Sequence, residues 1–369
     1  MILSNFTTNT KDNRMLRWFI IRLLLLPFSL IYGLIVAIRN YFYDKGILSS
    51  TSFSLPVISV GNLSVGGSGK TPHIEYLINL LKDHIHIGTL SRGYKRKTSG
   101  YLEVFGHSLP KNTGDEPLQF KRKFPEIMVA VSENRDTGII SMVGDRPHLQ
   151  TILLDDAFQH RAVKPHLNIM LTEYARPFFD DFFLPSGRLR EWRSSYKRAD
   201  VIIVTKCPDD LSPEKRKEFL EKIKPMDHQK VFFSKYEYST PYYLFNPKYT
   251  FELREDFQIL LLSAIANTDY LMNYLEPKVE QIVEMEYPDH YHFTPNDIGK
   301  LNTYFGRMHK KEKVIITTEK DAMRLNEHKD YLVKNKLPVF VLPVKVKFLG
   351  NDEALFNEHI QQFLVNFES

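Results

Sequence analysis

Short aliphatic runs alternate with helical patterns through the first two thirds of the chain. Between the first two runs, Ile74, Leu77, Ile78 and Leu81 follow the i, i+3, i+4, i+7 spacing, which predicts an amphipathic helix over 70–82. Strands that alternate with helices in this way are typical of an α/β fold with a largely parallel sheet and helices on both faces. The predicted strands are 57–60, 85–90, 127–131, 151–154, 168–171 and 201–205.

A stretch rich in proline and tyrosine, residues 238–250, separates these runs from a second set of elements. Such a change of composition indicates a domain boundary. We therefore expect a larger domain over 46–237, a hinge or connector over 238–250, and a smaller α/β domain over 251–369 whose last helix can pack back on the first domain. The second set comprises predicted strands at 258–264, 314–317 and 339–342 and predicted helices at 269–275, 295–307 and 353–367.

The segment 19–38 is almost entirely apolar and is flanked by basic residues, among them Arg14, Arg17 and Arg39. About 20 residues could just span a bilayer. However, Pro27 interrupts the segment, and Arg22 within it must extend its charge to the membrane surface. We therefore expect 1–45 to form a helix that lies in or dips into the membrane interface. A buried core helix is the alternative, and the sequence leaves the depth of insertion open.

Composition narrows the class of protein without fixing its partner. The single cysteine, Cys207, cannot form an intramolecular disulfide, which fits a reducing cytoplasm. The net charge of +5 favours anionic partners, whether phospholipid, nucleic acid or a phosphorylated substrate. No basic stretch interleaved with aromatic residues stands out, so we expect no nucleic-acid partner, and we expect a monomer.

The strongest local motif is VISVGNLSVGGSGKTPHIEYL, in which an apolar strand enters a glycine-rich loop and then a helix. Backbone amides of Gly66, Gly67, Ser68 and Gly69 can converge on phosphate oxygens at a helix N-terminus. We expect Lys70 to bind the β- and γ-phosphates of a nucleotide. The Thr71 hydroxyl is expected to bind Mg²⁺. The usual P-loop pattern has glycine where this chain has Ser64.

Two further segments bear on the nucleotide. Asp155 and Asp156 end a predicted strand, where carboxylates can bind Mg²⁺ and orient water. The segment 205–209 (TKCPD) resembles a guanine-reading motif only with its aspartate one position late. ATP is therefore the expected nucleotide.

Together, several motifs resemble the tetraacyldisaccharide 4'-kinases, which phosphorylate the lipid A precursor. The resemblance extends from residue 14 to about 325. It includes a serine or threonine at the position of Ser64. Ala157 and Trp192 depart from the family pattern, in which glycine and proline are usual. The matching segments are 60–72, 90–94, 114–117, 155–161, 184–191, 288–291 and 317–322.

The resemblance implies roles for particular side chains. Asp115 is the implied base that accepts the proton of the sugar hydroxyl, with His290 as its partner from the second domain. Read without the resemblance, Asp115 is an ordinary helix cap. The other implied roles are phosphate clamps at Arg190 and Arg135, a metal-binding carboxylate at Glu191, nucleotide contacts at Gln159 and His160, and glycolipid contacts at Arg92 and Tyr94.

The implied function is transfer of the γ-phosphoryl group of ATP to the 4'-hydroxyl of tetraacyldisaccharide 1-phosphate. The expected location is the cytoplasmic face of the inner membrane, as a peripheral or monotopic protein. Closure of the two domains about the connector would exclude water. A membrane-docked P-loop ATPase that switches partner binding is the alternative. The role of the Lys320-Asp321 pair stays open, with a structural salt bridge as the default.

Overall fold

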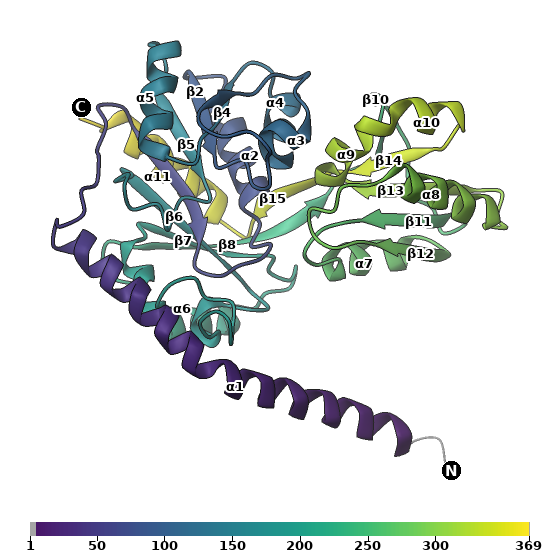
Figure 1. Cartoon of the computed structure of the whole chain (residues 1–369), viewed down its shortest axis with the longest axis horizontal. Coiled ribbons are helices and arrows are strands. Elements are labelled where there is room, and N and C mark those ends of the chain that lie inside the picture. Colours follow the sequence, from purple (N-terminus) through teal and green to yellow (C-terminus); the bar gives the residue numbers. More distant parts are fainter. Residues whose placement is uncertain (1–4, 369) are drawn as a thin grey trace.

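The computed structural model describes residues 5–368, with side chains from residue 21 onward. A nine-stranded sheet forms the larger unit, and its strands are β1 (Val57–Asn62), β2 (Ile87–Ser91), β3 (Leu102–Glu103), β4 (Met128–Val131), β5 (Thr151–Asp155), β6 (Leu167–Glu173), β7 (Val201–Thr205), β8 (Lys230–Tyr238) and β15 (Val344–Phe348). They follow the order β15-β8-β7-β6-β1-β5-β2-β4-β3 (Figure 1). All neighbours are parallel except β15 with β8 and β3 with β4.

Helices cover both faces of this sheet, as the alternation within β1 shows. Ile58 packs in the cluster that contains Leu77 of α2, whereas the preceding Val57 packs in the cluster that contains Ile139 of α5. The helices of the larger unit are α2 (Lys70–Leu81), α3 (Pro110–Thr113), α4 (Asp115–Lys123), α5 (Arg135–Asp145), α6 (Pro213–Ile223) and α11 (Asp352–Val365). The predicted α/β fold with a largely parallel sheet is confirmed.

The smaller unit has a six-stranded sheet with the order β10-β9-β14-β13-β11-β12. Strands β11 to β14 are parallel, and β9 and β10 continue the sheet with antiparallel pairing. The strands are β9 (Tyr242–Tyr243), β10 (Asn246–Thr250), β11 (Gln258–Ser263), β12 (Gln281–Glu286), β13 (Lys313–Thr318) and β14 (Val339–Leu342). The helices are α7 (Asp269–Leu275), α8 (Pro295–Arg307), α9 (Glu319–Leu325) and α10 (Lys329–Lys334).

The chain passes between the two units twice (Figure 1). It leaves the larger unit after β8 and returns through Pro343 into β15, which pairs with β8 from Val344 to Phe348. The expected connector over 238–250 therefore differs from the structure, because most of it forms β9 and β10 of the smaller sheet. The expected second domain over 251–369 also differs, because β15 belongs to the sheet of the larger unit. Helix α11 packs on β8 and β15, in line with the expectation that the last helix can pack back on the first domain.

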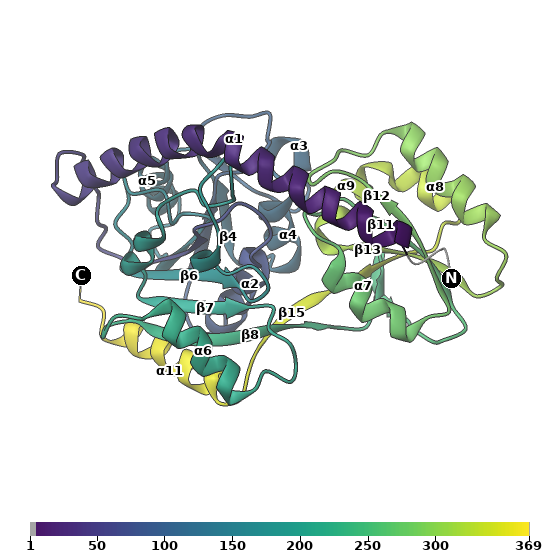
Figure 2. The same cartoon turned by 90° about the horizontal axis from the view of Figure 1, so that it is seen from below.

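Helix α1 (Asn5–Asp44) runs along the outside of the larger unit and projects beyond it (Figures 1 and 2). Polar contacts attach it: the Trp192 indole N–H donates to the Gly33 carbonyl at 2.9 Å, and the Asn40 amide donates to Glu191 at 3.3 Å. By length and composition, Ile21–Asp44 is apolar enough to cross a membrane. Its exposed apolar side chains are Ile21, Leu23, Leu24, Leu26, Phe28, Leu30, Ile31, Leu34, Ile35 and Ile38. The basic side chains expected at Arg14 and Arg17 lie outside the described side chains.

Replacing Phe356 with alanine should lower the unfolding free energy of the larger unit by about 3–5 kcal/mol, because a buried ring leaves a cavity. Phe356 is 1% exposed, and its ring packs on Phe232 and Phe348 with centroid separations of 5.4 and 4.7 Å. Leu355, which is exposed on the same helix, is the control and should change stability by less than about 0.5 kcal/mol. Urea unfolding followed by circular dichroism measures both. Equal losses would contradict the packing of α11 on the sheet.

Candidate active site between the two units

The glycine-rich loop follows β1 and ends where α2 begins. Gly69 caps the helix with φ +90°, and a β-carbon there would lie 2.8 Å from the Tyr236 hydroxyl. Only glycine fits this position without strain or displacement. The Gly69 carbonyl accepts a hydrogen bond from Nδ1 of the buried His73 at 2.7 Å, which fixes the end of the loop. The N-terminus of α2 thus adds its partial positive charge at the loop.

A second segment, 188–190, lies against the start of this loop. The Val65 amide donates to the Arg188 carbonyl at 2.8 Å, and the Arg190 amide donates to the Leu63 carbonyl at 2.7 Å. Because backbone bonds set this register, the Arg190 side chain is held beside the loop.

Four side chains meet at the carboxyl ends of β1 and β5. Lys70 donates to Asn62 Oδ1 at 3.1 Å and lies 3.5 Å from Asp156. The Arg190 guanidinium donates to both oxygens of Asp156, at 2.8 and 3.1 Å, and also to Asn62. Burial alone would raise the pKa of Asp156, but the charges of Lys70 and Arg190 outweigh it and hold the pKa below its usual range. The cluster therefore holds two cations where phosphates would enter.

Asp155 has a different environment from its neighbour. Its carboxylate accepts a hydrogen bond from the Ser91 hydroxyl at 3.1 Å. Burial, together with the negative charges of Asp156 and Glu116, raises the pKa of Asp155 to about 7. A cation bound there would reverse this effect, so the site favours an incoming positive charge.

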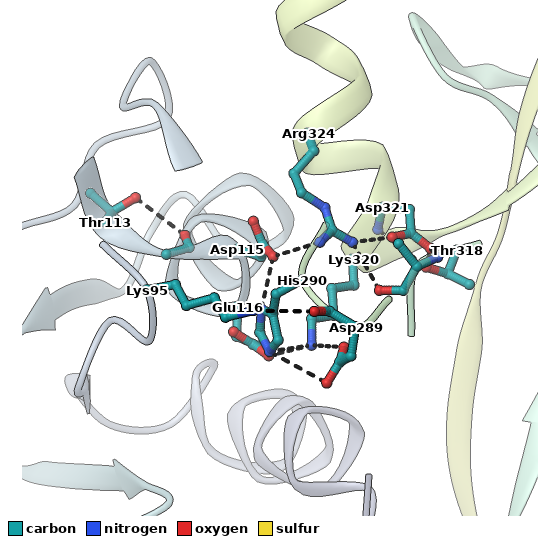
Figure 3. A network of polar contacts seen from close by, with 12 residues as sticks. Lys95, Thr113, Asp115, Glu116, Asp289, His290, Thr318, Lys320, Asp321 and Arg324 are labelled. Carbon is teal, nitrogen blue, oxygen red and sulfur yellow. Dashed lines mark hydrogen bonds and ion pairs between the residues drawn. The ribbon is translucent and has the colours of Figure 1, made fainter. Parts of the chain in front are cut away.

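The second cluster joins the two units. His290, in the loop before α8, places Nδ1 3.2 Å from Asp115 Oδ2 at the start of α4 (Figure 3). The buried Arg324 of α9 lies 3.5 Å from the same carboxylate oxygen and is held by Asp321. Asp115 is thus contacted from the smaller unit by two different elements.

Lys320 of α9 completes this cluster. Its ammonium lies 2.9 Å from Glu116, 3.3 Å from Asp289 and 2.9 Å from His290 Nε2 (Figure 3). Burial would raise the pKa of Glu116, but the Lys320 ammonium beside it outweighs burial and lowers the pKa to about 2. Glu116 is therefore a permanent anion opposite α9.

The loop 91–94 connects the two clusters. Ser91 bonds Asp155, and Gly93 packs against Gly114, the residue that precedes Asp115. The Tyr94 ring lies against His290 with a centroid separation of 4.9 Å. The Lys70 cluster and the Asp115–His290 pair are therefore linked by one short loop.

A family model described as tetraacyldisaccharide-1-P 4'-kinase matches residues 21–365. The chain belongs to the tetraacyldisaccharide-1-P 4'-kinase family. The resemblance inferred from its motifs is thereby confirmed.

Relatives of this kinase family match along nearly their whole length. A tetraacyldisaccharide 4'-kinase of Bacteroides thetaiotaomicron is 42% identical, with 91% of each chain covered. One of Flavobacterium johnsoniae is 44% identical, with 94% of this chain and 98% of that protein covered. Among solved structures, LpxK from Aquifex aeolicus in complex with ATP is 31% identical, with a TM-score of 0.70 over 93% of this chain and 99% of that one.

Some of the predicted site residues lie together. Lys70, Arg190 and Asp156 form the first cluster, with Asp155 beside it. Thr71 follows Lys70 in the first turn of α2, and Gly66, Gly67 and Ser68 form the loop. Asp115 and His290 form the second cluster, with Tyr94 against His290 and Arg92 exposed in the same loop.

Other predicted residues have contacts that differ from their expected roles. Glu191, the carboxylate expected to bind metal, is buried. It is bound by Arg198 at 2.6 Å and by Asn40 of α1. Its negative charge is therefore already balanced by Arg198, which is not part of the glycine-rich loop. The buried Arg135, an expected phosphate clamp, donates to the carbonyls of Asp155 and Ser132.

The surroundings of Gln159 and His160 differ. The Gln159 amide donates to the Asn62 carbonyl at 2.9 Å. Burial, and then the charges of Arg135 and Arg92, lower the pKa of His160 to about 4, so its ring is neutral at pH 7. A neutral ring can donate to a phosphate oxygen only through one N–H.

Sequence reasoning missed several contributors. Asn62, Ser91 and Glu116 carry no catalytic signature of their own, and each lies within a segment that was recognised for a neighbour. Their signal was position, because Asn62 and Ser91 are the polar last residues of buried strands and Glu116 follows Asp115 directly. Lys320 and Arg324 depend on packing between the units, which local sequence does not specify.

Replacing Asn62 with alanine should weaken ATP binding about tenfold or more, because a hydrogen bond to a charged group contributes about 1.5–3 kcal/mol. Asn62 orients both Lys70 and Arg190, so its loss leaves two cations without a fixed geometry. Isothermal titration calorimetry measures the affinity. The exposed Asn79 on α2 is the control, and its alanine variant should bind ATP like the parent. Unchanged affinity in both variants would remove Asn62 from the site.

Proposed function

We propose that this kinase transfers the γ-phosphoryl group of ATP to the 4'-hydroxyl of tetraacyldisaccharide 1-phosphate, with Asp115 as the base. One observation carries the assignment of roles: Asp115 and His290 come from different units yet are in contact, and the loop 91–94 links this pair to Asp155 beside the Lys70 cluster. Family membership supports the activity, and the residue roles are our proposal.

The loop 66–69, with Lys70 and Thr71, is proposed to bind the phosphates of ATP. Backbone amides and the α2 N-terminus suit anionic oxygens, and Lys70 is already oriented by Asn62. Arg190 also contacts Asp156 and can take part of the charge that moves to the leaving group. A solved relative was obtained in complex with ATP, which supports this use of the site.

The donor set also fits Mg²⁺ bound together with ATP. Within the described residues, no group of three or more histidine, cysteine or acidic side chains could hold a metal alone. Mg²⁺ in kinases instead takes one or two carboxylates, a hydroxyl and phosphate oxygens. Asp155, Asp156 and Thr71 can supply these protein ligands, and the bound ion would neutralise charge on the phosphates.

The acceptor hydroxyl is a weak nucleophile, so its proton must be accepted as the new bond forms. In the proposed reaction the sugar oxygen attacks the γ-phosphorus, the bond from that phosphorus to the β–γ bridging oxygen breaks, and ADP leaves. Asp115 accepts the hydroxyl proton, and His290 orients the carboxylate. The exposed Tyr94 and Arg92 are proposed to contact the sugar.

We also propose that the larger unit binds ATP while the smaller unit completes the site. His290 and α9 reach Asp115 only when the units are in contact, so this contact would exclude water from the site once it is loaded. The two units are connected by two chain segments, residues 239–241 and Pro343, about which such a closure would take place. We further propose that the protein acts as a monomer.

The N-terminal helix is proposed to dock on the cytoplasmic face of the inner membrane, where a lipid substrate is reached. Its apolar side chains point outward while polar contacts at Gly33 and Asn40 hold it on the kinase. This arrangement fits a helix in the membrane interface.

Replacing Asp115 with asparagine should reduce the transfer rate about 10²- to 10⁴-fold, the usual contribution of a positioned base. The amide keeps the size of the carboxylate but cannot accept the proton. Transfer of labelled phosphate from ATP to tetraacyldisaccharide 1-phosphate in mixed micelles measures it.

Two further measurements make this test specific. ATP affinity should stay within about twofold, because Asp115 is not part of the phosphate loop. Asp83, which is exposed, provides a control whose asparagine variant should transfer normally. A fully active Asp115→Asn variant would exclude Asp115 as the base. Steady ATP hydrolysis without labelled lipid from the parent protein would support the switch ATPase instead.

Replacing both Ile31 and Ile35 of α1 with aspartate should reduce binding to anionic phospholipid vesicles more than about tenfold, since each aspartate in hydrocarbon costs about 2.5–3.5 kcal/mol. Both side chains are exposed. Sedimentation with vesicles measures the bound fraction. The Val333→Asp variant, which changes an exposed residue of the smaller unit, should bind normally. Unaltered binding of the double variant would place the membrane contact elsewhere.

A further inference from the structure

Lys320 lies at the first turn of α9 and faces a histidine rather than only carboxylates. Its Nζ is 2.9 Å from His290 Nε2 and 2.9 Å from Glu116 Oε1 (Figure 3). An ammonium group carries three donors and no acceptor. The contact with His290 is therefore a hydrogen bond only if Nε2 accepts.

This restriction determines where the proton of the His290 ring lies. If Nε2 accepts from Lys320, the neutral ring carries its proton on Nδ1. Nδ1 is 3.2 Å from Asp115 Oδ2, so its N–H points at the proposed base. The alternative acceptors near Nε2 are Asp289 and Glu116, at 3.7 and 3.9 Å, which is too far for a hydrogen bond.

The ammonium form of Lys320 is well supported by its surroundings. Burial alone would lower the pKa of Lys320, but the Glu116 and Asp289 carboxylates outweigh it and the pKa is raised. Glu116 stays ionised because its own pKa is lowered to about 2. Lys320 thus remains a donor across the pH range in which the kinase would work.

The backbone beneath Lys320 is held on both sides. The preceding Glu319 pairs with Lys123 of α4 at 2.8 Å. The following Asp321 is fully buried and accepts hydrogen bonds from the Thr318 hydroxyl at 2.7 Å and the Ala264 amide at 3.1 Å. These contacts fix the start of α9, so the Lys320 ammonium returns to one place whenever the units meet.

We propose that Lys320 is a positioning residue for the Asp115–His290 pair: it donates to His290 Nε2 and so fixes the ring in the tautomer whose Nδ1–H is directed at Asp115. The proposal rests on the proposed function for its catalytic meaning, whereas the tautomer itself does not depend on it. It gives the Thr-Glu-Lys-Asp motif a role beyond a structural salt bridge.

Loss of the Lys320 donor has a defined consequence. The ring could then place its proton on Nε2, facing the carboxylates of Glu116 and Asp289, and turn the Nδ1 lone pair toward the Asp115 carboxylate. It could also take up a second proton. Either state changes the hydrogen bond that orients the base.

Ring nitrogen NMR on protein labelled with ¹⁵N-histidine tests the tautomer directly. The His290→Gln variant assigns the signals, because it removes only those of His290. In the parent protein we expect His290 as a neutral ring protonated at Nδ1. In Lys320→Met we expect a second tautomer or an imidazolium signal, and in Lys320→Arg a return toward the parent spectrum, because a guanidinium also donates.

Lys123→Met is the matched control. It also removes a lysine between α4 and α9, but its partners are Glu75 and Glu319 rather than His290. If Lys320 acts only as an ion pair between the units, the two methionine variants should alter the His290 signals alike. We expect only Lys320→Met to change the tautomer. A parent ring protonated at Nε2 or doubly protonated would overturn the proposal without any variant.

Kinetics give an independent readout. Lys320→Met should lower kcat about ten- to hundredfold, part of the 10²- to 10⁴-fold that a positioned base supplies, with the KM for ATP nearly unchanged. Lys320→Arg should recover most of the loss. A loss confined to KM would contradict a positioning role. A fully active Asp115→Asn variant together with an Nδ1-protonated ring would reject the base but keep the tautomer assignment.

Discussion

Buried charge between α4 and α9 is the constraint on which the active site depends. Three acidic groups of the larger unit, Glu75, Asp115 and Glu116, lie in or near this contact. Lys320 and Arg324 enter from the smaller unit, and Lys123 links Glu75 to Glu319. Removing one partner of a buried ion pair typically costs about 3–5 kcal/mol, because the other charge is left without compensation. The same pairs that join the units therefore also fix the geometry around Asp115.

The arrangement around Lys70 follows from a more local rule. Parallel strands end at one edge of the sheet, so β1 and β5 deliver Asn62 and Asp156 to the same place. The loop then needs only a glycine that accepts a positive φ and a lysine that follows it. Asp156 and His290 both have positive φ themselves, at 49° and 60°. Such backbone is uncommon outside glycine and is often found at functional positions.

Elements with a local pattern could be predicted from sequence, whereas pairing between distant segments could not. The strands 57–60, 151–154 and 201–205 and the helix over 70–82 were found because their patterns are local and their strands are buried on both faces. β12 was missed because it is an edge strand with exposed glutamates, and β15 because alternate residues face solvent. The return of β15 to the larger unit depends on pairing with β8, more than a hundred residues earlier.

The same argument applies to the site residues. Lys70 and Thr71 belong to one local motif, so their positions within that motif are enough to predict their roles. Glu191 was recognised by its motif, yet its pairing with Arg198 and Asn40 depends on where α1 packs, which the motif does not encode. Lys320 was noticed without a role because its partners lie 30 and 204 residues away in sequence. Roles that arise from contacts between units need the fold before they can be assigned.

The contacts of Arg190 and Glu191 also connect the N-terminal helix to the Lys70 cluster. Asn40 of α1 binds Glu191, and the Tyr32 hydroxyl donates to the Arg190 carbonyl at 3.1 Å. Arg190 in turn holds Asp156. The segment 188–190 is thus bonded on one side to the glycine-rich loop and on the other to the apolar helix. A change in the position of α1 would therefore reach the Lys70 cluster through backbone and side-chain bonds that do not pass through the smaller unit.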